Sequence, residues 1–126
     1  MDDTAADATG PSPLIPQPAS NPEALRAALT LLAPQLLPAF EAEWATALKR
    51  ARETVSAGPL HQFIGPWAMH VAIQRHPDRA ARLRELETRA AETDSLDEAR
   101  AMISEIGRIL DFAAVEAGIA QYPRPR

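Results

Sequence analysis

Three histidines supply the imidazole groups of this chain, the side chains best suited to metal binding or proton transfer near neutral pH. His61 and His70 are nine residues apart on a predicted helix, so at about 100° per residue they point in opposite directions. His76 follows beside a proline. No pair has the four-residue spacing of a helical metal site, and the chain has no cysteine. We therefore expect no metal and no cofactor.

Carboxylates could form an acid–base pair, but their spacing here is unfavourable. Glu41 and Glu43, like Glu85 and Glu87, are two residues apart, and residues two apart do not share a helix face. The serines lack the flanking glycines of a nucleophile elbow, and the five glycines do not gather into a phosphate-binding loop. We predict no catalytic residues and a protein that is not an enzyme.

Four arginines recur at helical spacing around the turn at Pro77, and they are Arg75, Arg79, Arg82 and Arg89. A helix, a short break and an arginine-rich helix superficially resemble a helix-turn-helix, which favours nucleic-acid binding. Neighbouring Glu85 and Glu87 dilute this charge, and the net charge of −4 with a pI near 5.3 is unusual for a nucleic-acid binder. An ordinary solvated helix face is the simpler interpretation, and DNA binding stays the alternative.

Length and composition predict one small helical domain. The chain has 126 residues, of which 46% are hydrophobic but only 5% are aromatic. Alanine supplies much of the apolar content, which favours closely packed helices with a thin core. No apolar run reaches the roughly 20 residues of a membrane span, and the acidic start lacks the features of a signal peptide. We expect no membrane association and a cytoplasmic protein.

Proline, glycine and capping residues delimit the predicted helices, which cover about 21–33, 34–57, 59–75, 77–91 and 96–117. Asn21 is an N-cap, Gly58 is placed to end the second helix, and Ser95 with Glu98 forms a capping box. Gly65-Pro66 predicts a kink or break inside the third helix. Residues 1–20 are predicted to be disordered or extended, 21–118 to form the helical domain, and 119–126 to be a flexible basic tail.

These elements predict an all-α fold, a four- to five-helix bundle. Its expected core is Phe40, Trp44, Leu48, Phe63, Ile64, Trp67, Ile103, Ile106 and Leu110. The last helix has apolar residues at alternating steps of three and four over 96–117, which suits packing inside the domain. The same stripe would also suit a homo-oligomeric structural protein. A small-molecule carrier would instead need a pocket near Trp44 and Trp67.

Short motifs in the first three helices resemble a family of small uncharacterised actinobacterial helical proteins. They are Phe40-Glu-Ala-Glu-Trp44, Ala51-Arg-Glu-Thr54, Pro59-Leu-His-Gln-Phe63, Trp67 and Arg75-His-Pro-Asp78. The resemblance covers roughly residues 21–89. That family is loosely associated with gene pairs of the toxin–antitoxin type. The resemblance implies a helical domain that binds a protein, with a basic toxin encoded nearby as the partner.

The resulting hypothesis is a non-enzymatic protein-interaction module, antitoxin-like or regulatory, in a bacterial gene pair. An acidic helical protein could cover the groove of a basic toxin with carboxylates from the second helix. The candidate partner-binding residues are Glu41, Glu43 and Glu53. Under the DNA-binding alternative the candidate residues are instead the four arginines.

Overall fold

The computed structural model describes residues 12–119, which form five α-helices, one short 3-10 helix and no strand. The elements are α2 (Pro22–Leu32), η1 (Pro34–Leu36), α3 (Leu37–Thr54), α4 (Gly58–Gln74), α5 (Pro77–Glu92) and α6 (Leu96–Glu116). The predicted all-α class is confirmed. None of these helices is long and apolar enough to cross a bilayer. The predictions for residues 1–11 and 120–126 lie outside the described residues.

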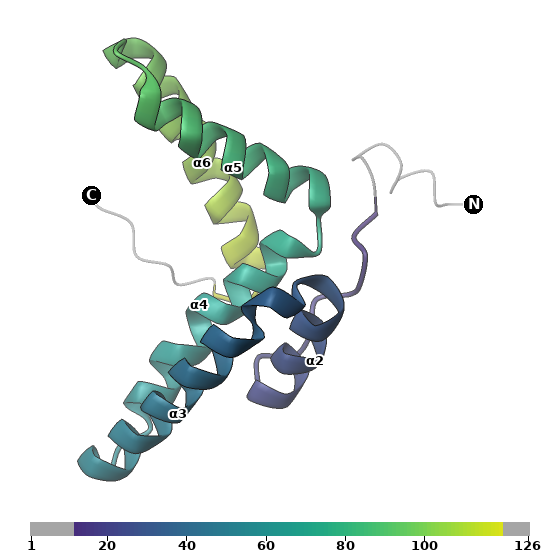
Figure 1. Cartoon of the computed structure of the whole chain (residues 1–126), viewed down its shortest axis with the longest axis vertical. Coiled ribbons are helices and arrows are strands. Elements are labelled where there is room, and N and C mark those ends of the chain that lie inside the picture. Colours follow the sequence, from purple (N-terminus) through teal and green to yellow (C-terminus); the bar gives the residue numbers. More distant parts are fainter. Residues whose placement is uncertain (1–11, 120–126) are drawn as a thin grey trace.

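Two helical hairpins project toward opposite ends of the molecule (Figure 1). One hairpin consists of α3 and α4, and the other consists of α5 and α6. Helix α4 is central, because it contacts α2, α3, α5 and α6. Since the second hairpin meets the rest of the described structure mainly at its base, the far end is held, within residues 12–119, by the pairing of its own two helices.

Side-chain caps define two helix starts as the sequence predicts. Asn21 Oδ1 accepts a hydrogen bond from the Ala24 amide at 2.8 Å at the start of α2. At the start of α6, Ser95 Oγ accepts from the Glu98 amide at 3.2 Å. The return bond of the capping box runs through Thr93, whose hydroxyl donates to the Glu98 carboxylate and accepts from the Ser95 amide.

The turn between α3 and α4 differs from the prediction. The left-handed residue that ends α3 is Val55, with φ of 50°, and Gly58 begins α4 instead of ending α3. Of the predicted kink or break at Pro66, the break is absent, because α4 is helical from end to end. Gly65 has no Cβ to clash with the proline ring, and the Gln62 carbonyl that loses its amide partner belongs to an exposed residue.

An aromatic cluster between α3 and α4 forms the centre of the core. Phe40 is fully buried, with ring centroids 5.1 Å from Phe63 and 5.2 Å from Trp67. Trp44 packs on Phe63 from the outside at 5.1 Å. Leu25 and the neighbouring apolar residues of α2 close the cluster on another side. These contacts confirm the prediction that the aromatic residues of α3 and α4 build the core.

In the last helix the predicted core is wrong for Ile103, whereas Leu110 packs against the core as predicted. Ile103 has 60% of its surface exposed, whereas Ile106 and Leu110 are half-buried. The residues of α6 that are buried instead are Met102, Ala113 and Ala114. Because α4 and α5 are the only helical neighbours of α6 within residues 12–119, these residues leave one flank of its wide apolar stripe uncovered.

The segment 12–20 has no helix or strand but runs against the helical domain. The Leu14 amide donates to the Arg75 carbonyl at 2.8 Å, and the Gln17 side-chain amide donates to the Ala68 carbonyl at 3.3 Å. Ile15 packs against the core while Leu14 stays 63% exposed. The described part of this segment is therefore extended and attached along α4.

Candidate functional site

The arginine row predicted as a nucleic-acid surface forms an ion-pair seam between α5 and α6. Arg82 donates two hydrogen bonds of 2.8 Å to the two carboxylate oxygens of Glu105. It also pairs with Glu85 at 3.1 Å, and Arg89 approaches the same carboxylate at 3.7 Å. The hydrogen bonds from Arg82 hold the pKa of Glu105 below its ordinary value. Arg82 therefore joins α5 to α6, whereas Arg89 pairs with a carboxylate of its own helix.

The first two arginines of the row meet at a buried junction at the base of the hairpin. Oε1 of Glu116 lies 3.2 Å from Arg75, 3.2 Å from His76 and 3.3 Å from Arg79. Arg75 also donates to the Ile15 carbonyl at 3.0 Å. One carboxylate thus joins the end of α4, the start of α5 and the end of α6, and Arg75 adds the N-terminal segment.

Burial lowers the pKa of His76 below its ordinary value of 6.5, and the neighbouring Arg79 and Arg75 lower it further. Glu116 acts in the opposite direction but does not outweigh them. The imidazole is therefore neutral at pH 7. His76 is a structural hydrogen-bonding group at the junction.

The other two histidines lie at separate places. His70 stacks on the Trp67 ring at a centroid distance of 5.2 Å, and His61 is exposed on α4. Within residues 12–119, no three metal-binding side chains come together.

The three predicted partner-binding carboxylates lie on α3, and two of them are bonded within the protein. Glu41 pairs with Arg26, whose hydrogen bond lowers the pKa of that carboxyl group. Glu43 accepts a 2.8 Å hydrogen bond from the Trp67 indole. Glu53 makes only a 3.9 Å pair with Lys49. The structure does not bring the three into one free acidic patch.

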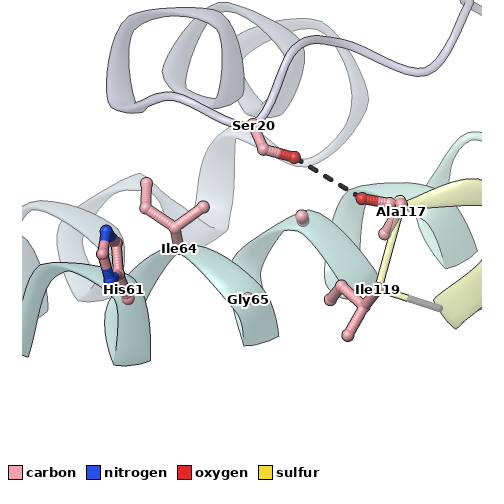
Figure 2. A pocket seen from close by; sticks show the side chains of 8 residues that line it. Ser20, His61, Ile64, Gly65, Ala117 and Ile119 are labelled. Atoms are coloured by element: carbon pink, nitrogen blue, oxygen red, sulfur yellow. Dashed lines mark hydrogen bonds between the residues drawn. The ribbon is translucent and has the colours of Figure 1, made fainter. Parts of the chain in front are cut away.

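A shallow groove of about 400 Å³ lies where the segment before α2, the middle of α4 and the end of α6 meet (Figure 2). It is lined by Ser20, His61, Ile64, Gly65, Ala68, Ala117, Gly118 and Ile119. Its size is at the lower end of small-ligand sites. Neither Trp44 nor Trp67 lines it, so the groove is not the pocket that a small-molecule carrier would need near those two residues.

Large apolar side chains are exposed on α6, and of these the sequence analysis assigned Ile103 to the core. Leu96, Ile103, Phe112 and Val115 have 64%, 60%, 58% and 69% of their surface exposed. Phe112 is partly covered by the Arg79 guanidinium, 4.8 Å from the ring centre. For Leu96 and Ile103, the width of the apolar stripe of α6 indicated this exposure in the sequence, because it exceeds what one packed face can bury.

The fold and these surfaces define a small all-α protein made of two helical hairpins. Residues 13–110 match the model of a family of unknown function (DUF6247), and the chain belongs to that family. No curated protein and no solved structure matches it. The family match begins before α2 and includes most of α6, so it extends beyond residue 89, where the resemblance predicted from the motifs ended.

Proposed function

We propose that this chain is a non-enzymatic protein-interaction module, acting as the antitoxin-like or regulatory member of a bacterial gene pair. The exposed apolar side chains of α6 are the observation that carries this proposal. Leu96 and Ile103, seven residues apart, lie on one side of α6. Exposed apolar surface on a small protein usually marks a site where another molecule binds. The gene-pair role comes from the family resemblance of the motifs in α3 and α4.

The polar groups support an interaction surface on α6 better than one on α3. Glu41 and Glu43 already have internal partners, so a toxin would have to compete with Arg26 and Trp67 for them. By contrast, the exposed side chains of Leu96 and Ile103 would release only the water that covers them when a partner binds. An apolar centre with polar surroundings is the usual composition of a binding surface.

DNA binding is supported less well, because a phosphate would have to displace internal carboxylates. Arg82 is engaged by Glu105, and Arg75 and Arg79 are engaged by Glu116. If the arginines did bind DNA, Arg79→Ala and Arg82→Ala would weaken binding and reduce its salt dependence. We expect no mobility shift of any DNA at low salt.

Co-purification with the product of the adjacent gene tests the proposal. The affinity-tagged chain, co-expressed with that product, should retain it in stoichiometric amount through a second chromatography step. A matched arm uses the same tag on an unrelated acidic helical protein, which should retain nothing. Failure to bind the product of any encoded neighbour would contradict the gene-pair role.

A further inference from the structure

We propose that the far half of the α5–α6 hairpin binds a basic amphipathic helix contributed by a partner protein. This inference rests on the proposed interaction function and names its site. The surface, called here the distal face, consists of Leu96 and Ile103 with the half-buried Ala90 and Ala99. Residues 96, 99 and 103 share one side of α6, because they are separated by three, four and seven positions.

The distal face is open because the hairpin has only two helices. Leu86 and Met102 are buried outside the main core cluster and fill the space between α5 and α6. The Arg82–Glu105 pair closes one flank. On the other flank, Leu83 and Leu110 pack against the main core near the base of the hairpin. Toward the tip of the hairpin, beyond Leu83 and Leu110, the main core no longer covers this flank. A third helix packed along it would complete a small three-helix bundle.

The charge at the end of the hairpin indicates the sign of the partner's charge. Residues 92–98 contain four carboxylates and no basic residue. Asp97 and Glu98 have a local role, since acidic groups favour the first turn of α6. Glu92 is the last residue of α5, where the helix dipole disfavours negative charge, and it makes no ion pair to a residue in 12–119. Basic side chains of a partner would offset that cost.

A second copy of the chain fits this surface poorly. The distal face spans about 15 Å of helix length and two helices of about 10 Å width, so it offers on the order of 300 Å². A stable protein dimer needs about 800 Å² from each partner. Residues 77–116 carry six arginines and ten carboxylates, so two copies would also repel each other. A single amphipathic helix needs only such a narrow apolar strip.

Nuclear magnetic resonance titration with designed peptides tests this site in the full-length protein. The probe is an 18-residue helical peptide with leucine at positions i, i+3, i+4 and i+7 and lysine elsewhere. A matched peptide carries glutamate in place of every lysine. We expect the lysine peptide to shift the amides of residues 87–106, and the glutamate peptide to shift none of them. Added salt should weaken the binding.

Paired substitutions distinguish specific binding at the distal face from nonspecific hydrophobic binding. Leu96→Ser with Ile103→Ser should weaken the lysine peptide at least about tenfold, whereas Leu31→Ser, at a 72% exposed leucine of α2, should leave its affinity unchanged. Unchanged affinity in the double variant, shifts confined to another surface, or a homodimer that the double variant dissolves would each overturn the proposal. If a complex with the natural partner covers other surfaces of the protein and not the distal face, the proposed site is wrong. The proposed interaction function would still hold.

Discussion

Arg82 and Glu105 face each other across the α5–α6 hairpin through two parallel hydrogen bonds of 2.8 Å. The pair joins residues 23 positions apart and closes one flank of a two-helix arm. A planar guanidinium and a carboxylate match in this bidentate geometry, which a lysine could not reproduce. The position of Arg82 in the arginine row is therefore explained by the pairing of the two helices.

Exchanging the two partners tests this role. Arg82→Glu alone places three carboxylates together with Glu85 and Glu105, so we expect a lower melting temperature by circular dichroism. Adding Glu105→Arg restores an opposite-charge pair and should recover part of the loss. If both variants melt like the wild type, the pair does not support the hairpin. The effect should shrink in high salt because both groups are partly exposed.

Acidification should destabilise the protein through His76. The folded pKa of His76 lies below 6.5, so the unfolded chain binds a proton more readily than the folded chain. The stability from neutral His76 is present above pH 6.5 and is lost as the pH falls from 6.5 toward the lowered folded value. Denaturant midpoints between pH 7.5 and 5 measure this loss.

Replacing His76 itself tests that prediction. His76→Gln keeps a donor for Glu116 and should flatten the pH dependence relative to the wild type. An unchanged slope in His76→Gln would assign the effect to other groups. The charged neighbours of His76 are Arg75 at the end of α4, Arg79 on α5 and Glu116 on α6.

Truncating the central aromatic residue should cause a large loss of stability. Phe40 is fully buried against Phe63 and Trp67, so Phe40→Ala should cost about 3–5 kcal/mol in free energy of unfolding. Phe112→Ala removes the same ring from a 58% exposed site and should cost less than about 1 kcal/mol. Urea denaturation followed by circular dichroism compares the two, and similar losses would contradict the described core.

Replacing Val55 with glycine should stabilise the protein. Val55 adopts a φ of 50° at the end of α3, where a β-branched side chain is strained, and its side chain is 91% exposed. Removing the Cβ should gain about 1 kcal/mol, reduced in part by the greater freedom of glycine in the unfolded chain. Val55→Ala retains the Cβ and should gain less, as thermal unfolding would show. A loss of stability in Val55→Gly would contradict the left-handed conformation.

Local signals predicted the helices but not how they pair. Asn21 and Ser95 cap helices as expected, because a cap depends on neighbouring residues alone. Val55 was missed because its conformation is imposed by the hairpin turn against its own preference. The α3 and α4 aromatic residues were placed correctly in the core, since both helices have neighbours on several sides.

Which side chains are free at the surface depends on contacts between helices, and the spacing of residues in the sequence does not reveal such contacts. Arg82 and Arg79 looked free because their partners, Glu105 and Glu116, lie on another helix. Ile103 looked buried because its spacing matches the stripe of α6, while the open flank arises because the described part of the chain places no third helix beside the hairpin. Such features require the tertiary arrangement.

Light scattering coupled to size exclusion tests the interaction function most directly. The chain of 13.7 kDa is measured alone and after co-expression with the product of the adjacent gene. We predict one peak with the summed mass of a stoichiometric complex. The double substitution Leu96→Ser with Ile103→Ser should dissociate this complex into its two proteins. Two separate peaks for the wild-type pair, each with the mass of one protein alone, would contradict it.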